Sequence, residues 1–284
     1  MKRIIFIFTA LLIFLLGATD APDETPTFFK TETAEVPIVM YHLITKKGHL
    51  LGQWGITPQE LESDLKWLKD NNYETVVMED LINFVKRGKN LPDKPIVLSF
   101  DDGNSSDYYY LYPLLQKYDM KAVVSVLGKF ADECSELATK SDRPKYFPNL
   151  TWEQIKELHE SKHIELQSHS YNLHGRIGSK QKSGESIEIY HQRLKTDLEK
   201  NQERIKEMTN ATPSTFTYPY GMISDNSQTA LEALGFKASL GCRVGVNTLT
   251  EGDEQCLFRL KRADRPHGVC ISEVLKKMQK SRGD

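Results

Sequence analysis

Hydrophobic and polar positions follow two different periods along the chain from residue 36 onward. Short apolar runs, among them VPIVMYH (residues 36–42) and KPIVLSF (residues 94–100), are typical of buried strands. Between these runs, TPQELESDLKWLKDNN (residues 57–72) has a threonine cap, a proline in the first turn and leucines at helical spacing. EDLINFVKRG (residues 79–88) reads as a further helix that ends at a glycine. This part of the chain therefore predicts strands that alternate with helices.

The alternation continues toward the C-terminus. Further strands are predicted for YETVVM (73–78), KAVVSVLG (121–128), HIELQSHS (163–170), STFTYPY (214–220) and KASLGC (237–242). Further helices are predicted for YYYLYPLLQKYD (108–119), TWEQIKELHES (151–161), residues 186–208 and SQTALEALG (227–235). Strands separated by helices imply a parallel sheet with right-handed crossovers. Because about seven such units follow one another, we expect an α/β fold that forms a closed or nearly closed barrel.

The N-terminal segment has a different pattern. Lys2 and Arg3 precede an apolar run that extends to Gly17 and is followed by small residues. This is the pattern of an export signal, and the run is short for a membrane span. We therefore expect residues 1–21 to be a signal peptide, with an uncleaved anchor as the alternative, and the protein to be secreted or attached to the cell surface. Residues 22–35 predict a linker, which leaves residues 36–284 as the domain.

Composition and charge narrow the class of protein. The 284 residues include 37 basic and 39 acidic side chains, and 39% of the residues are hydrophobic, which suits a globular domain with a large core. The basic residues are scattered, so we expect no nucleic-acid partner. We expect a monomer, with membrane contact only through the N-terminal segment if it is retained. The four cysteines form no CxxC pair, which leaves a disulfide among the last three and free thiols as equal alternatives.

Ionisable residues gather at the predicted strand ends, where the active site of a barrel enzyme lies. They are His42 after the first strand, Asp101 and Asp102 after the third, and His169 and His174 at and beyond the end of the fifth. Adjacent side chains of a regular strand point to opposite faces, but Gly103 frees the backbone to turn, so both aspartates can reach one site. A turn after His169 could likewise bring the two imidazoles together. Two histidines and a carboxylate can hold zinc, cobalt or nickel with positions left for water and substrate. The alternative is that both histidines are polar loop residues.

Four motifs carry a resemblance to a known family. PIVMYHLI, SFDDG, SHSYNLH and TYPYG, in this order and spacing, resemble the polysaccharide deacetylase family, the NodB-homology domain of carbohydrate esterase family 4. The resemblance covers roughly residues 36–270 and is strongest with the branch that has an early YHxI motif. It implies a distorted (β/α) barrel and a metal-dependent hydrolase that removes N-acetyl groups from polysaccharides that contain N-acetylglucosamine. The alternative is a non-catalytic carbohydrate-binding protein on the same barrel.

The resemblance also implies a role for each motif residue. Asp102, His169 and His174 would bind a divalent metal, with zinc preferred over cobalt or nickel. Asp101 would be the general base, and the backbone N–H of Tyr220 would hold the oxyanion. Residues predicted to contact the sugar are Trp54, in the loop after the first strand, and Tyr218 and Pro219 in the YPYG motif.

The general acid is less directly indicated. The commoner family pattern has a late histidine, and His267 lies in the corresponding region, but between Pro266 and Gly268, which indicates a loop. In members with the early motif the early histidine is thought to act instead. We therefore predict His42 as the acid, against the alternative of a structural hydrogen bond at a strand end.

The charge partner of the base is a second departure. Many family members carry an arginine where this chain has Thr217. A guanidinium suits a carboxylate because it can donate two hydrogen bonds. Arginines of the last segment could take over this role, or they could form a solvated basic face; they are Arg259, Arg262 and Arg265.

Overall fold

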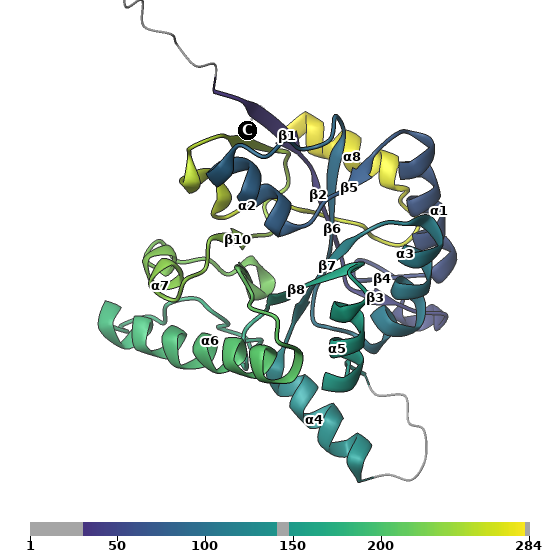
Figure 1. The fold of residues 1–284 in the computed structure, drawn as a ribbon. Coiled ribbons are helices and arrows are strands. Elements are labelled where there is room, and N and C mark those ends of the chain that lie inside the picture. Colours follow the sequence, from purple (N-terminus) through teal and green to yellow (C-terminus); the bar gives the residue numbers. More distant parts are fainter. Residues whose placement is uncertain (1–30, 141–147, 282–284) are drawn as a thin grey trace, which may run out of the picture. The chain divides into compact units, whose positions relative to one another are not determined.

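The computed structural model describes residues 31–140 and 148–281, and a curved parallel sheet forms its centre (Figure 1). Seven strands lie in the order β10-β9-β8-β7-β6-β2-β12, and β5 pairs with the beginning of β6. All neighbouring strands of this sheet are parallel. The strands are β2 (Ile38–Tyr41), β5 (Glu74–Thr75), β6 (Pro95–Phe100), β7 (Ala122–Val126), β8 (Ile164–Ser168), β9 (Thr215–Thr217), β10 (Ala238–Leu240) and β12 (Ala263–Asp264). The predicted barrel of about seven parallel strands is confirmed.

The chain between β10 and β12 brings the two edges of the sheet together. Leu260 forms an isolated parallel bridge with Leu240, the last residue of β10. Gly241 N–H donates to the Leu260 carbonyl at 2.8 Å, and Leu260 N–H donates to the Ser239 carbonyl at 2.8 Å. Three residues later the chain enters β12 beside β2. The ends of the two edge strands, β10 and β12, are therefore close to each other. A site built from several strand ends requires this.

Helices cover the outside of the sheet (Figure 1). They are α1 (Pro58–Asp70), α2 (Met78–Arg87), α3 (Tyr112–Tyr118), α4 (Gly128–Thr139), α5 (Trp152–Glu160), α6 (Ile187–Thr209), α7 (Ser227–Ala233) and α8 (Ile271–Lys280). The largest apolar core joins leucines of α1 and α5 to the side chains of β6, β7 and β8. Capping boxes at Thr57 and Thr151 fix the starts of α1 and α5, because side chain and backbone satisfy each other there.

Two predicted elements are shorter or less regular than expected. YETVVM forms only the two-residue β5, because it pairs with no more than the first two residues of β6 before α2 begins. The predicted helix over residues 108–119 starts as a π-turn at Asp107–Leu111 and continues as α3. Pro113 is the second residue of α3 and follows the π-turn directly. Helices α4 and α8 were not predicted.

The boundary of the domain also differs from the prediction. β1 (Thr33–Val36) pairs antiparallel with β11 (Asn247–Thr250), so residues 33–35 belong to the domain rather than to a linker. The predicted signal peptide at residues 1–21 lies outside the described residues. Among the residues that are described, no helix has the length and apolar character needed to cross a membrane.

The four cysteines are free thiols.

Candidate active site

The predicted site residues meet in a cavity of about 340 Å³ at the C-terminal ends of the strands. Its lining comprises seven of them, namely His42, Trp54, Asp101, Asp102, His169, His174 and Tyr220, together with Met40, Leu43, Asn104 and Cys242. The last four were not predicted. Leu43 and Asn104 follow the YH and DDG motifs directly, and Cys242 follows β10, so the position of these three after strand ends was the available signal, whereas Met40 lies within β2.

A sharp turn directs both aspartates into this cavity. Asp101 still follows the sheet, since its N–H donates to the Tyr41 carbonyl at 3.1 Å. Asp102 has φ of 74° and Gly103 has φ of 63°, both in the left-handed region. That conformation costs a non-glycine residue roughly 1–2 kcal/mol. The side-chain amide of Asn149 offsets part of the cost by donating to the Asp102 carbonyl at 3.1 Å. The turn lets adjacent carboxylates share one site.

Asp102 and the two histidines form a compact group of potential metal ligands. The Asp102 Oδ1 atom lies 3.4 Å from His169 Nε2 and 3.2 Å from His174 Nε2. One ligand atom from each of the three residues lies within 4.8 Å of the others. The loop after β8 achieves this by turning at Ser170, whose φ is 81°. This turn brings His169 and His174, five residues apart, to the same carboxylate, as expected from the sequence.

The outer nitrogens of both imidazoles fix their orientation. His169 Nδ1 lies 2.8 Å from the Thr217 carbonyl oxygen, which can only accept, so Nδ1 carries the proton. His174 Nδ1 lies 3.1 Å from the Tyr220 hydroxyl. Such outer partners hold metal-binding imidazoles in the tautomer that offers Nε2 to the metal.

Asp102 Oδ1 and the two Nε2 atoms face one another, and a cation between them would stabilise this arrangement. Asp102 Oδ1 is buried and has no hydrogen-bond donor among the described residues, and it faces Nε2 of both imidazoles. Burial would raise the pKa of Asp102, but the two imidazoles beside it hold that pKa far below its usual value. Burial would lower the pKa of His169, yet Asp102 raises it. The donor set of two nitrogens and one carboxylate oxygen fits a divalent transition metal.

Asp101 is held by Arg262. Arg262 donates from Nη1 to Asp101 Oδ1 at 2.7 Å and from Nη2 to Oδ2 at 2.9 Å. Both residues are buried, with exposures of 0% and 2%. Burial would raise the pKa of the Asp101 carboxyl, but the charge and hydrogen bonds of Arg262, together with the imidazoles of His169 and His42, lower that pKa. Asp101 is therefore ionised and lines the same cavity as the potential metal ligands.

The other two arginines bind elsewhere. Arg265 donates to the buried carboxylate of Asp64 at 2.8 and 3.1 Å, and Arg259 lies on the surface with Nη1 3.9 Å from Asp225. The hydroxyl of Thr217, at the position where many family members carry arginine, lies 2.7 Å from the hydroxyl of Ser125. Of the three arginines that were open from the sequence, Arg262 is the one that binds Asp101.

The two candidate acids lie in different places. His42 lines the cavity, with Nε2 4.0 Å from Asp101 Oδ2 and its ring centroid 4.6 Å from that of Trp54. Burial lowers the pKa of His42, against the opposing charges of the aspartates. His267 does not line the cavity, and its Nδ1 atom lies 2.8 Å from Glu60 Oε2 at the start of α1. The geometry favours His42 over His267.

The YPYG segment divides into an exposed and a buried part. Tyr220 has φ of 56° and is 58% exposed, and its ring packs against His174 with centroids 4.4 Å apart. Tyr218 is completely buried, and its hydroxyl lies 2.7 Å from that of Ser227. Pro219 is buried as well. Neither Tyr218 nor Pro219 lines the cavity, which does not agree with their predicted contact with substrate.

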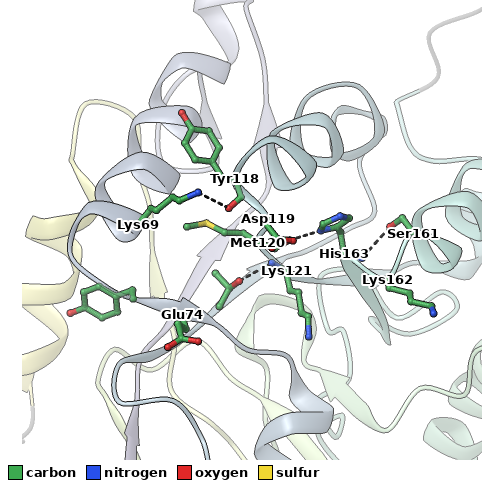
Figure 2. A pocket seen from close by; sticks show the side chains of 11 residues that line it. Lys69, Glu74, Tyr118, Asp119, Met120, Lys121, Ser161, Lys162 and His163 are labelled. Carbon is green, nitrogen blue, oxygen red and sulfur yellow. Dashed lines mark hydrogen bonds between the residues drawn. The ribbon is translucent and has the colours of Figure 1, made fainter.

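A second hollow, of about 610 Å³, lies at the opposite ends of β5, β7 and β8 (Figure 2). Its polar groups bond to one another: His163 Nδ1 lies 2.8 Å from the Met120 carbonyl, and Lys69 Nζ lies 3.5 Å from the Tyr118 carbonyl. Figure 2 shows that its charged side chains do not converge on one point. The hollow therefore lacks the arrangement found at the strand ends.

Comparison with known proteins decides the family. A family model described as polysaccharide deacetylase matches residues 88–239. The chain belongs to the polysaccharide deacetylase family. The poly-beta-1,6-N-acetyl-D-glucosamine N-deacetylase of Escherichia coli (strain K12) is 29% identical over 198 residues, which cover 62% of this chain and 29% of that protein. The protein of the same name from Staphylococcus aureus (strain N315) is 22% identical over 257 residues, which cover 83% of this chain and 84% of that protein.

Solved structures support the fold of this polysaccharide deacetylase. A de-N-acetylase from Aggregatibacter actinomycetemcomitans matches with a TM-score of 0.72 at 23% identity, over 86% of this chain and 99% of that chain. The family match spans the two aspartates and both potential metal-binding histidines. His42 lies before the matched stretch and Arg262 after it. β12 next to β2 brings these two ends of the chain together at the site.

Proposed function

We propose that the protein is a metal-dependent N-deacetylase of polysaccharides that contain N-acetylglucosamine. The observation that carries the proposal is the pairing of two different carboxylates: Asp101 is ionised and held by Arg262, while Asp102 faces two imidazoles. Relatives named as poly-beta-1,6-N-acetyl-D-glucosamine N-deacetylases support the choice of substrate class.

Asp102, His169 and His174 would hold the metal, with zinc as the first expectation and cobalt or nickel as alternatives. A divalent ion in such a site acidifies water and polarises a carbonyl group. Asp101 remains outside this ligand set and accepts the proton of the attacking water. The bidentate contact with Arg262 keeps Asp101 fixed and charged before the reaction.

The remaining steps concern the acetamide oxygen and the leaving amine. The backbone N–H of Tyr220 is our proposed donor to the oxyanion. His42 lies near Asp101, with 4.0 Å between Nε2 and Oδ2, and would donate the proton that the amine needs to leave. The exposed indole of Trp54 is our proposed contact for a sugar ring.

Export, suggested by residues 1–21, is also a proposal, and it would place the enzyme where extracellular and cell-wall polymers are. The second candidate function is carbohydrate binding without turnover. An ionised carboxylate that is fixed beside a metal site but outside its ligand set has no evident use in such a protein. Catalysis is therefore the better explanation.

Release of acetate tests the proposal. The purified protein is incubated with oligomers of β-1,6- and β-1,4-linked N-acetylglucosamine, with chelator, and with zinc, cobalt or nickel restored. We expect acetate release that chelation abolishes and a metal restores. Binding of the oligomers without acetate release under any of these metals would favour the carbohydrate-binding alternative.

A further inference from the structure

His42 is held in the cavity differently from the other two histidines. His169 and His174 are oriented by partners of their Nδ1 atoms, whereas the ring of His42 makes no hydrogen bond within residues 31–140 and 148–281. Its distance of 4.0 Å to Asp101 is too long for one. The indole of Trp54 is the aromatic group in contact with it, at 4.6 Å between centroids and 59° between planes. The indole therefore takes the place of a hydrogen-bonding partner.

The loop that carries Trp54 is fixed beside His42. Leu43, the residue after His42, donates its N–H to the Trp54 carbonyl at 2.9 Å and pairs with Gly55 as β3 (Leu43–Ile44) meets β4 (Gly55–Ile56). A side chain at position 55 would clash with the backbone oxygen of Leu50, so the tight loop depends on glycine there.

The same loop is also tied to β12. Gln53 Nε2 donates to Asp264 Oδ2 at 3.1 Å, and His267 N–H donates to the Gly52 carbonyl at 2.8 Å. Hydrogen bonds therefore fix the backbone around Trp54, although this residue is 48% exposed.

An indole ring next to it suits the protonated form of an acid histidine. Aromatic faces attract cations, and the effect is strongest for tryptophan. The charged groups around His42 act in both directions: Asp101 and Asp102 favour its protonation, whereas Arg262 and His169 oppose it. The indole attracts the protonated imidazole of His42. It has no acceptor group that could take the proton that the leaving amine needs.

We propose that Trp54 is a positioning residue for the general acid: it holds the His42 ring in the orientation that protonates the leaving amine, besides contacting the sugar. This inference rests on the proposed function. Trp54 then contacts the acid while about half of the residue stays exposed, so that a sugar bound there would also shield His42 from water.

A double-mutant cycle tests this role. Trp54→Leu and Trp54→Phe are made in the wild-type and His42→Ala backgrounds, and kcat and KM are measured for an N-acetylglucosamine oligomer and for an aryl acetate, whose leaving group barely needs a proton. Leu50→Ala is the matched control, because Leu50 is an exposed apolar residue of the same loop that does not line the cavity. Metal binding is measured for every variant as a check on folding.

We expect Trp54→Leu to lower kcat on the oligomer by roughly fivefold to thirtyfold, the range that a cation–π contact can supply, and to lower kcat on the aryl acetate by less than about threefold. Trp54→Phe should recover most of the loss. In the His42→Ala background, Trp54→Leu should lower kcat no further. Leu50→Ala should match the wild type on both substrates.

Other results would overturn the inference in recognisable ways. A loss from Trp54→Leu that is just as large in the His42→Ala background, or a rise in KM alone on the oligomer, would leave Trp54 as a sugar contact only. Absence of acetate release by the wild type with any metal would instead refute the proposed function. Wild-type activity of His42→Ala would refute the assignment of the acid, and with it the role of Trp54.

Discussion

Arg262 and Asp101 are 161 positions apart in the chain, yet they share two hydrogen bonds of 2.7 and 2.9 Å within the buried part of the site. The contact exists because β2 lies between β6, which ends before Asp101, and β12, which begins after Arg262. Both partners are desolvated, so each depends on the other for its charge to be tolerated. In the proposed mechanism this pair stabilises the fold and also keeps Asp101 charged as the base.

Replacing Arg262 with lysine should reduce turnover without removing the charge. An ammonium group cannot reproduce the two parallel hydrogen bonds of a guanidinium, so Asp101 should lose its fixed orientation. We expect Arg262→Lys to lower kcat by about tenfold or more and the free energy of unfolding by roughly 1–3 kcal/mol. Enzyme kinetics and urea unfolding measure the two effects. Arg259→Lys is the control, since its surface ion pair should contribute less than about 1 kcal/mol, and wild-type kcat in Arg262→Lys would contradict the prediction.

The two adjacent aspartates should separate into two functions when each is replaced by asparagine. Asp101→Asn should keep the metal but lose roughly 10²–10⁴-fold in kcat, because the amide cannot accept a proton from water. Asp102→Asn should weaken metal binding by more than the roughly 10- to 100-fold that loss of an outer-shell partner costs. Metal titration calorimetry and acetate release distinguish the variants. Equal loss of metal affinity in both would show that the proposed division is wrong.

Local sequence patterns were sufficient for every strand of the central sheet except β12 and for the positions of the candidate site residues at strand ends. The apolar run of β6 and the DDG sequence after it are contiguous, so the position of the two aspartates follows from a pattern a few residues long. The same holds for His42 after β2 and His169 after β8. A parallel sheet then brings these strand ends to one edge without further information.

Other features depend on contacts between distant segments, which periodicity does not contain. Only the pairing of the two-residue β12 with β2 selects Arg262, because all three arginines have similar local surroundings in the sequence. β1 was missed because its partner, β11, is more than 200 residues away. Tyr218 and Tyr220 look alike in the YPYG motif, but a left-handed residue at position 220 turns one outward while the other joins the core.

Glu60 should make stability depend on acidic pH. Its carboxylate accepts hydrogen bonds from the N–H groups of Thr57 at 2.8 Å and Gly268 at 2.7 Å. Burial would raise the pKa of Glu60, but its hydrogen bonds lower that pKa to about 2. Because the folded pKa lies below the ordinary value of 4.5, the stabilisation is complete above pH 4.5 and disappears as the pH falls toward 2.

Glu60→Gln is therefore expected to lower the free energy of unfolding by about 1–2 kcal/mol at neutral pH, after allowance for solvent screening, and by less at pH values near 3. Urea unfolding at a series of pH values measures the difference. Glu153→Gln, at an exposed position in the first turn of α5, is the matched control and should show no such trend. A Glu60→Gln penalty that stays constant down to pH 3 would show that the carboxylate charge is not the cause.

The identity of the general acid can be tested by changing how much the leaving group needs a proton. An amine leaves an acetamide only when it is protonated, whereas the phenolate of an aryl acetate leaves without help. His42→Ala should therefore slow acetate release from an N-acetylglucosamine oligomer by roughly 10²–10⁴-fold and affect an aryl acetate much less, with metal binding unchanged. Steady-state kinetics on both substrates measure this ratio.

His267→Ala is the comparison that makes this test decisive, because the sequence left both histidines open. His267 bonds to Glu60 at the start of α1 and does not line the cavity, so its loss should leave the ratio of the two activities at the wild-type value. A small drop in stability is expected from the lost bond to Glu60, and it should affect both substrates equally. If His267→Ala selectively slowed the oligomer while His42→Ala did not, the loop after β12 would have to approach the cavity during turnover, and the late histidine would be the acid.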